Sequence, residues 1–453
     1  MRKLVVLGFL LVTFAGVVSL GAEYIEITAW ASGSPVDATR CQNLVAAAGD
    51  LESELAAEGA PTAKIEPSCQ YTHVEDWSAY LRRFRLAFEA GQAPWIFACG
   101  HELIGELAAA GLIVPLDEYY EKYWDKYELG DIYPALIDAC KYQGKIYGFP
   151  QDTEARPVYF RKDALRELGW SEEEIEALPQ KVLNGEFTLD DMIAVAKEAV
   201  EKGLVEWGIY HRPSPGGYFH MITMAYGGIL QDLETGKLVL DKAATLKNLE
   251  FHARLVKEGV TPAAMTQTSW RSIHKAVVEG DVLFWFGGTW HWAEWQRVAY
   301  HGELGALPEE YEWENLGFML VPAAEKGGKP VTQSHPFVYV VTKQAEDPEL
   351  AFRLIALTAK PELVAKHAIG SGHLTIRKTN APEYEAWKFG TAVTYMLDYT
   401  TTLPNHAKWS VYHRAVYDAI QAVETGAMTP EAALDWLEDK LTRELGDELI
   451  VKE

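Results

Sequence analysis

Short apolar runs and longer amphipathic stretches alternate through the first third of the chain. Residues 24–30 read YIEITAW, whose alternating apolar and polar positions predict a strand. A stretch with helical spacing then runs from Asp37 toward Glu58. The succession continues with a strand, a helix, a strand and a helix at 63–71, 76–92, 95–99 and 102–111. This order predicts an α/β fold with a mainly parallel sheet covered by helices on both faces. Ligands collect at the carboxyl ends of such strands.

The middle and end of the chain are richer in helical patterns. Residues 142–165 have the pattern of two short strands around a polar turn, and 188–203 predict a helix that Thr188 caps. Strand patterns return at 316–322 and 336–343. Further helices are predicted at 243–259, 270–279, 348–359, 410–426 and 429–445. The glycine-rich joints between these elements are short, so two lobes would be tightly connected.

The first 22 residues have the three parts of a signal peptide. Arg2 and Lys3 form a basic start, an apolar run follows, and cleavage after Ala22 would suit the peptidase. An uncleaved membrane anchor is the alternative. No later segment of the sequence is long and apolar enough to span a bilayer. We expect an exported protein, periplasmic or extracellular.

Charge narrows the possible partners. The formal net charge is −24, from 41 Lys and Arg against 65 Asp and Glu. Nucleic acid and anionic membranes both demand a basic face, so neither is expected to bind. A strongly anionic ligand is also disfavoured, unless a local arginine holds it.

The four cysteines, Cys41, Cys69, Cys99 and Cys140, all lie in the first third of the chain. An even number in an exported chain favours disulfides, and buried free thiols are the alternative. Spacing does not determine the pairing. We predict Cys41 with Cys69, which would tie the start of the first helix to the neighbouring strand, and Cys99 with Cys140. No Cys-x-x-Cys occurs, which argues against a zinc knuckle or a thioredoxin-type site.

Residues 284–292 read FWFGGTWHW, with three tryptophans around a pair of glycines. Such a segment is either a hydrophobic plug with a tight turn or a rigid stacking surface at the mouth of a cleft. Trp285, before the glycines, is expected in the core.

Several pieces of the chain resemble, in the expected order, the carbohydrate-binding group of the extracellular solute-binding proteins of ABC importers, which includes the maltose-binding proteins. These pieces include AFEAGQAPWIFACGHELIGELAAAGLIVPLDEY, GKIYGFPQDTEARPVYFRKDAL, FTLDDMIAVAKEA, FGGTWHW, GFMLVPAAEKGG and TPEAALDWLEDKL. The resemblance implies two α/β lobes that close on a ligand by a hinge motion. The first lobe would take 23–131 and 332–394, and the second 132–331 and 395–453.

The resemblance also implies a set of aromatic ligand contacts. Trp290 falls where the family carries an indole that stacks on a sugar ring. An indole suits this role because its flat surface covers the apolar face of a sugar. Trp292 either faces the ligand or supports Trp290 from behind. Trp409 would be a second stacking indole, or a helix-packing residue. Tyr218 matches an aromatic residue of the cleft.

Polar contacts follow from the same comparison. Glu154 matches a carboxylate that accepts sugar hydroxyls, and Asp152 lies beside it. Arg156 would bind a hydroxyl, a carboxylate or a phosphate, or pair with Glu154 or Asp152. His101 and Glu102 stand where maltose-binding proteins have an acidic residue followed by Arg, so maltose itself is in doubt. The remaining candidates are His101, Ser32 and His335.

The expected function is a monomeric receptor that captures a sugar between its lobes and delivers it to the permease of an ABC transporter, with no cofactor. One alternative keeps the fold and binds a polyol phosphate or a glycerophosphodiester through Arg156, Arg212, His101 or His335.

A secreted glycosidase using Asp152 and Glu154 is the less favoured alternative. Residues two apart on a strand share a face, whereas glycosidase carboxylates come from separate elements. No GxSxG, P-loop or HExxH motif occurs, and His291 with His101 would make only a partial metal site.

Overall fold

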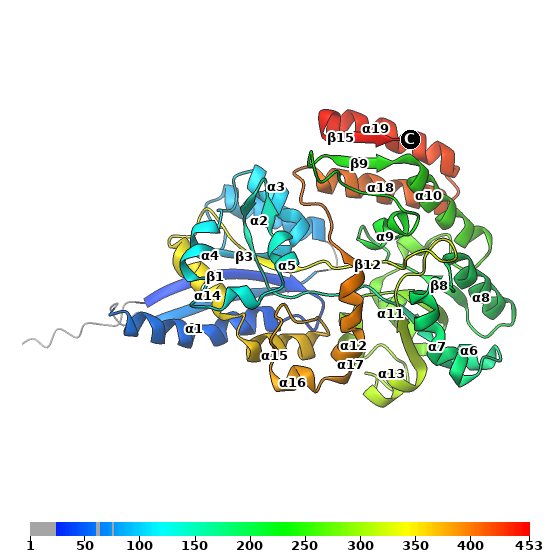
Figure 1. Ribbon diagram of the computed structural model, residues 1–453, viewed down its shortest axis with the longest axis horizontal. Coiled ribbons are helices and arrows are strands. Elements are labelled where there is room, and N and C mark those ends of the chain that lie inside the picture. The colour runs from blue at the N-terminus through cyan, green and yellow to red at the C-terminus, as the bar shows by residue number, and fades with distance from the viewer. Residues whose placement is uncertain (1–23, 60–63, 75–76) are drawn as a thin grey trace, which may run out of the picture.

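A computed structural model describes residues 24–59, 64–74 and 77–453. The predicted signal peptide lies outside the described residues. Figure 1 shows two lobes side by side, joined by segments that cross between them. Within the described part of the chain, no helix is long and apolar enough to cross a membrane.

The first lobe is built on a five-stranded sheet. Its strand order is β2 (Lys64–His73), β1 (Tyr24–Gly33), β3 (Ile96–Gly100), β13 (Phe337–Val341) and β6 (Gly148–Pro150). The first three strands are parallel, as predicted, but β13 runs antiparallel to both β3 and β6, so the sheet is mixed. Because β6 pairs with β13, this sheet takes in the chain as far as residue 150, beyond the expected boundary at 131.

Helices cover both faces of this sheet. Successive residues of β3 point to opposite faces, as strand geometry requires. Ile96 and Ala98 pack with α1 (Thr39–Ala57) and α14 (Pro348–Leu357), whereas Phe97 and Cys99 pack with α2 (Trp77–Glu89). The two hydrophobic cores thus sandwich the sheet, which confirms the predicted layers.

The second lobe has a four-stranded sheet of order β11 (Leu316–Met319), β7 (Val158–Arg161), β10 (Val282–Phe286) and β8 (Trp207–Tyr210). One large core joins it to its helices, chiefly α8 (Leu189–Glu201), α10 (Lys242–Lys257), α18 (Trp409–Glu424) and α19 (Pro430–Leu445). The hydroxyl of Thr188 accepts a hydrogen bond from the Asp191 amide, which confirms it as the cap of α8. The helices expected near 243–259 and 270–279 are α10 and α11 (Trp270–Glu279).

The remaining elements are short. The other helices are α3 (Ile104–Ala109), α4 (Asp117–Tyr123), α5 (Pro134–Asp138), α6 (Lys162–Glu167), α7 (Glu172–Leu183), α9 (Tyr218–Ala225), α11 (Trp270–Glu279), α12 (Trp290–Trp295), α13 (Glu309–Asn315), α15 (Pro361–Ser371), α16 (Pro382–Glu385) and α17 (Lys388–Val393). The other strands are β4 (Lys141–Tyr142), β5 (Lys145–Ile146), β9 (Leu238–Asp241), β12 (Thr332–Gln333), β14 (Thr400–Thr401) and β15 (Leu449–Lys452).

Only one of the two predicted disulfides forms. Cys41 of α1 and Cys69 of β2 are bonded, with their Cα atoms 5.4 Å apart. Cys99 and Cys140 are both free, so that predicted pair is wrong. Both lie fully buried in the core between β3 and α2, where they pack as small apolar side chains.

The chain passes between the two sheets at several places. One passage lies between β6 and β7, because these strands belong to different sheets. A second lies between β11 and β13 and includes β12, which pairs in parallel with β14. These paired connecting strands lie between the lobes in Figure 1, and they position the residues described next.

Candidate functional site

The connecting segments 151–154 and 332–335 present two opposite faces, because side chains alternate along an extended chain. On one face the hydroxyls of Thr153 and Ser334 are hydrogen-bonded at 2.6 Å. Gln333, by contrast, contacts the loop that contains Gly217. A ligand bound between the lobes could therefore lie on either face.

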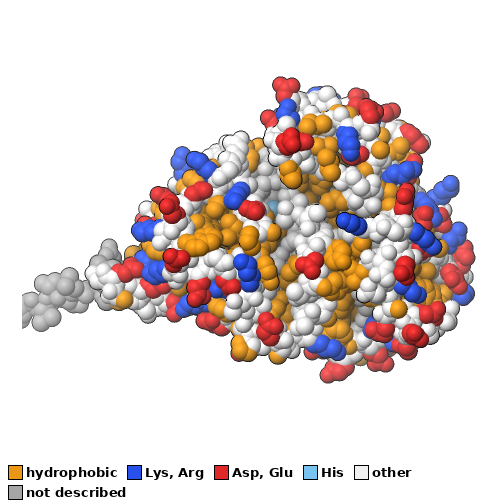
Figure 2. Space-filling model, viewed as in Figure 1, with side chains coloured by type: hydrophobic (Ala, Val, Ile, Leu, Met, Phe, Trp, Pro, Cys, Tyr) orange, Lys and Arg blue, Asp and Glu red, His pale blue; other side chains and the backbone are white. Residues whose placement is uncertain are grey.

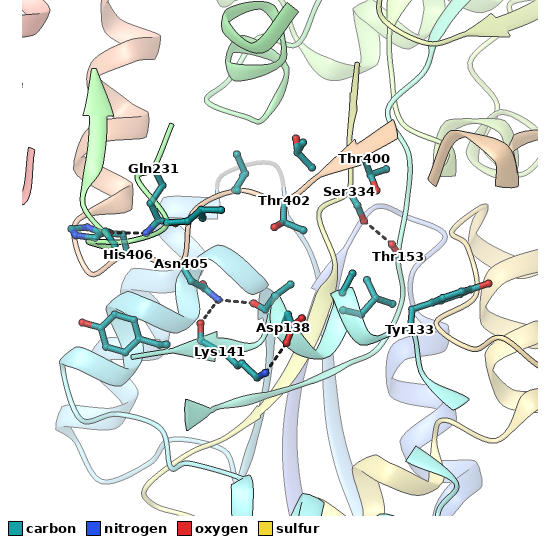
Figure 3. Close-up of a pocket in the computed structure, with 18 of the residues that line it drawn as sticks. Tyr133, Asp138, Lys141, Thr153, Gln231, Ser334, Thr400, Thr402, Asn405 and His406 are labelled. Atoms are coloured by element: carbon teal, nitrogen blue, oxygen red, sulfur yellow. Dashed lines mark hydrogen bonds and ion pairs between the residues drawn. The ribbon is translucent and has the colours of Figure 1, made fainter. Parts of the chain in front are cut away.

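A pocket of about 1290 Å³ lies on the Thr153 face. Its walls include Thr153, Ser334, β14 and the loop 231–236, and Asn405 spans it by donating hydrogen bonds to the carbonyls of Ala139 and Lys141 (Figure 3). Figure 2 shows the molecule hollowed between the lobes on this side. None of the ten ligand residues expected from the sequence is itself among the residues that line this pocket, although His101 contacts one of them, Leu403.

The opposite face holds an ion-pair network centred on Asp152. Its Oδ2 lies 2.8 Å from Nη2 of Arg40 and 2.9 Å from Nε2 of His367, and its Oδ1 accepts a hydrogen bond from the Phe337 amide. Burial alone would raise the pKa of Asp152, but His373 and Arg40 outweigh burial and lower it. Both carboxylate oxygens are thus occupied by protein groups, which suits a role in fixing the hinge more than direct ligand contact.

Glu154 and Arg156 form the next pair along this segment. Arg156 Nη2 lies 2.6 Å from Glu154 Oε1, and both residues are buried. Burial raises the pKa of the Glu154 carboxyl, although Arg156 opposes the change. Arg156 Nε has no hydrogen-bond partner among the described residues. A buried donor of this kind is costly unless something accepts from it.

Trp290 begins α12, directly after the turn that follows β10. A Cβ atom at Gly288 would lie 1.9 Å from the Trp290 ring, so only glycine lets the indole cross this turn. The half-buried indole stacks on His373 with centroids 5.5 Å apart and planes 11° apart. The Arg156 guanidinium lies 5.1 Å from the centre of the Trp290 ring. Gly288 of the FWFGGTWHW segment therefore leaves the space in which Trp290 lies against Arg156 and His373.

The other predicted aromatic residues are more deeply buried. Trp292 is 1% exposed, stacks on Phe389 and also meets the rings of Trp313 and Phe318, so it is a core residue of the second lobe. Trp285 lies in the same core, as expected. Tyr218 stacks on His211, and Trp409 packs against Tyr412 and His220. The Tyr218 hydroxyl and the Trp409 indole N–H have no hydrogen-bond partner in the described part of the chain.

The first lobe contributes His101 and Ser32 at the ends of β3 and β1. Nε2 of His101 donates to the Leu403 carbonyl at 3.1 Å, and burial lowers the pKa of His101 to about 4. Ser32 is fully buried, and its carbonyl accepts from Arg40 Nη1. His335 is partly exposed and pairs with Glu102.

Four further polar side chains join this face, although the sequence singled out only Arg212. Gln333 is fully buried, and neither its amide nitrogen nor its oxygen has a hydrogen-bond partner among the described residues. His413 meets His220 at 2.7 Å, and His373 stacks on Trp290. The signal for Arg212 is Gly216, where a Cβ would fall about 2 Å from the guanidinium, so the glycines after Arg212 make room for it.

Residues 64–394 match the family described as bacterial extracellular solute-binding protein. The chain belongs to this family. The maltotriose-binding protein of Pyrococcus abyssi (strain GE5 / Orsay) is 22% identical over 322 residues, covering 69% of this chain and 62% of that relative. This solute-binding protein thus spans less than two thirds of the length of that relative. A lactose-binding protein of Rhizobium radiobacter is 30% identical over 167 residues, 37% of this chain and 36% of that protein.

Solved structures share the two-lobed fold of the solute-binding protein. The GacH receptor of Streptomyces glaucescens, solved without ligand and with acarbose, gives a TM-score of 0.74 at 18% identity and covers 94% of this chain and 99% of its own. T. maritima MalE3 with bound maltose gives 0.72 at 19% identity and covers 92% and 99%. These relatives and neighbours are binding proteins, not enzymes. Family membership thus identifies the chain as a solute-binding protein and not as a glycosidase.

Proposed function

We propose that this protein is an exported receptor that captures a sugar between its two lobes and delivers it to the permease of an ABC transporter. The observation that carries the proposal is the half-buried Trp290 indole beside the Arg156 guanidinium, on a face whose buried polar atoms lack hydrogen-bond partners among the described residues. Arg156 Nε and both amide atoms of Gln333 are among these atoms. Sugars present hydroxyls at their rims and apolar faces between them, so an indole on the same face as such atoms matches their chemistry.

The family supports the role in transport, and sugars are the ligands named for several relatives. A maltotriose-binding and a lactose-binding protein are among them, and neighbouring structures contain maltose and acarbose. Glu154, Arg156, Ser32 and Trp290 are the proposed contacts. Tyr218 and Trp409 complete the proposed set at the second lobe.

A thermal-shift screen with neutral sugars, sugar phosphates and glycerophosphodiesters tests the proposal. A ligand that binds only the folded state stabilises it by about 2.7 kcal/mol at one hundred times its Kd. We expect at least one neutral mono- or oligosaccharide to raise the melting temperature by several degrees. A screen in which no neutral sugar acts, while a phosphorylated compound does, would favour the alternative.

Arg212 supports that alternative, a polyol phosphate or glycerophosphodiester. Its Nε donates to the Ser214 carbonyl, and no carboxylate lies within ion-pair distance of it among the described residues. Burial and then the neighbouring Arg156 lower the pKa of Arg212 to about 9, so it remains charged at neutral pH. A partly buried guanidinium without a carboxylate partner among the described residues is a suitable partner for a phosphate.

A further inference from the structure

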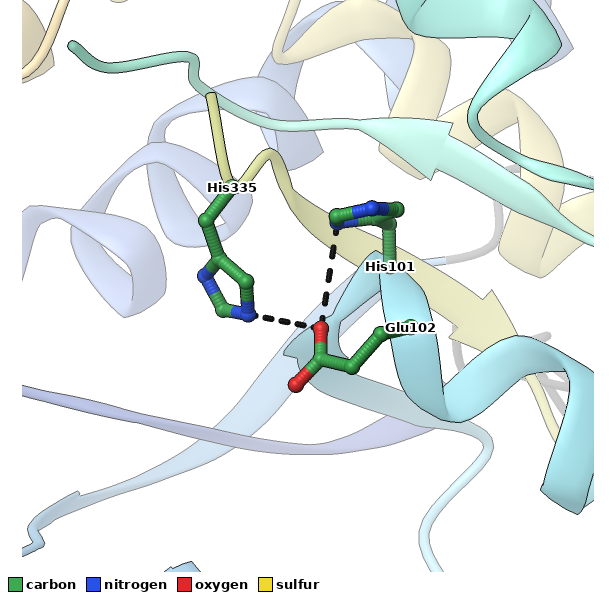
Figure 4. A group of neighbouring side chains, drawn as sticks. All are labelled: His101, Glu102 and His335. Atoms are coloured by element: carbon green, nitrogen blue, oxygen red, sulfur yellow. Dashed lines mark ion pairs between the residues drawn. The ribbon is translucent and has the colours of Figure 1, made fainter. Parts of the chain in front are cut away.

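Three side chains meet at the end of β3 on the first lobe. His101 and Glu102 follow β3 directly, and His335 stands just before β13. These strands pair antiparallel with Phe337 opposite Gly100, so the residues beyond the pair are brought together. Nε2 of His335 lies 2.6 Å from Glu102 Oε2, and Nδ1 of His101 lies 3.8 Å from the same oxygen (Figure 4).

The hydrogen bonding of His101 determines which of its nitrogens can bind an ion. The Leu403 carbonyl can only accept, so Nε2 of His101 carries the hydrogen and Nδ1 of the neutral ring has a free lone pair. The side chain is 0% exposed, and Nδ1 has no hydrogen-bond partner among the described residues. Histidines that bind metals commonly donate their second N–H to a backbone carbonyl in this way.

Space and access around the cluster are both suitable. A Cβ at residue 100 would lie 2.4 Å from Glu102 Oε2 and 2.6 Å from the His335 ring, so Gly100 keeps the room that the cluster needs. The side chains of Glu102 and His335 are 18% and 20% exposed, so an ion can enter from solvent. All three ligand atoms lie within 4.8 Å of one another.

Three other groups of histidine and carboxylate in the described chain are less suitable. His274 and His291 accept hydrogen bonds at Nδ1, so their Nε2 atoms carry hydrogen and offer no lone pair. Asp152 lies against the Arg40 guanidinium, which repels a cation. The group around Glu424 is fully buried, without a path for an ion.

We propose that His101 Nδ1, Glu102 Oε2 and His335 Nε2 form a site for a divalent transition metal, with zinc as the best match. Zinc takes nitrogen and oxygen ligands at about 2.0–2.1 Å, which puts tetrahedral ligands roughly 3.3 Å apart. The ion would replace the His335–Glu102 hydrogen bond, widening that separation slightly and drawing His101 closer. Three protein ligands leave one of the four positions for water or another small ligand. The site does not depend on the proposed sugar.

Titration of the chelator-treated full-length mature protein with zinc chloride, in competition with a chromophoric chelator, tests the site. We expect one equivalent to bind, and Glu102→Gln and His335→Gln each to weaken binding at least tenfold. His73→Gln, which changes an exposed histidine elsewhere on the same lobe, is the matched control and should bind as the wild type does. Cobalt substitution should give the visible absorption of a four-coordinate site in the wild type and the control.

Gly100→Ala provides a variant in which all three ligands remain but the space between them is filled. It should lose zinc binding while retaining a cooperative melt, as should both ligand variants. Absence of stoichiometric zinc binding to the wild type would overturn the proposal. Equal zinc affinity in Glu102→Gln, His335→Gln and His73→Gln would overturn it as well. Neither outcome bears on sugar binding, which the thermal-shift screen measures separately.

Discussion

At the scale of single residues, Trp290 and its neighbour Trp292 differ in burial and in the groups that their indoles contact. Trp290 is half-buried and lies among charged and polar groups, whereas Trp292 stacks on Phe389 inside a hydrophobic core. Two indoles two positions apart therefore meet different surroundings. Replacing each indole in turn therefore distinguishes an effect on ligand affinity from an effect on the stability of the fold.

We expect Trp290→Ala to lower ligand affinity by more than tenfold, about 1.4 kcal/mol, while shifting the melting temperature by only a few degrees. Trp292→Ala is the matched control, and its core cavity should cost roughly 3–5 kcal/mol of stability. Calorimetric titration and thermal melts of both variants check this. If Trp290→Ala melted as low as Trp292→Ala yet bound as well as the wild type, Trp290 would be a core residue.

The sequence predicted Trp290 and Glu154 as ligand contacts, because each lies in a contiguous piece with a recognisable order, and their roles in binding stay predictions. Gln333, His373 and His413 were missed, since they reach this face only through the crossings between the lobes. Strand and helix periodicity reports which side of one element a residue faces, not which distant segment it meets. The failed Cys99–Cys140 pair has a different cause. Counting cysteines does not reveal that a thiol also packs well as a small apolar side chain.

A second feature at the scale of single residues is the buried carboxylate of Glu424, whose ionisation contributes to the stability of the fold. Burial would raise its pKa, but His211 at 2.7 Å and His252 at 2.6 Å outweigh burial and lower it to about 2. A carboxyl whose pKa is lower in the folded state stabilises the fold above its unfolded pKa, near 4.5. That contribution, about 3 kcal/mol, is lost as pH falls from 4.5 toward 2.

We expect Glu424→Gln to be strongly destabilised at pH 7, by roughly 3–5 kcal/mol, because it leaves the histidines without their carboxylate. Its stability should also fall less than that of the wild type between pH 5 and pH 3. Urea unfolding at several pH values measures both effects. If the stability of the variant and that of the wild type changed with pH in parallel, Glu424 would not be the carboxyl group that makes the fold less stable in acid.

At the scale of elements, the disulfide joins α1 to β2 at an edge of the first sheet. It closes a loop of 28 residues, and the chain-entropy model gives such a bridge about 3–4 kcal/mol. We expect the double variant Cys41→Ser, Cys69→Ser to lose stability of that order in urea unfolding. Reductant should destabilise the wild type and Cys140→Ala alike, and should leave the double variant unchanged. A reductant effect on the double variant would point to another bridge.

At the scale of the whole molecule, the connecting strands separate two surfaces. One lines the pocket of about 1290 Å³, and the other presents Asp152, Glu154 and Trp290 to both lobes. Rotation of the lobes about these strands must narrow the space on one side and widen it on the other. Ligand capture is therefore expected to change the overall dimensions of the molecule.

We expect small-angle scattering to show a smaller radius of gyration when a sugar identified in the thermal-shift screen is added at saturation. Trp290→Ala at the same sugar concentration serves as the control and should keep the dimensions of the free protein. An unchanged radius in the wild type, with binding verified by calorimetry, would exclude hinge closure as the means of capture.

For a chain exported as proposed, the position of the single disulfide bears on the order in which its cysteines pair. Four thiols allow three complete pairings, yet the native bridge joins the two cysteines that come first in sequence. A secretory oxidase that links successive cysteines as they leave the translocon would make this bridge before Cys99 and Cys140 arrive. Burial then raises the pKa of both remaining thiols, which withholds the thiolate needed for exchange. Oxidative maturation of this protein should thus proceed without the help of a disulfide isomerase.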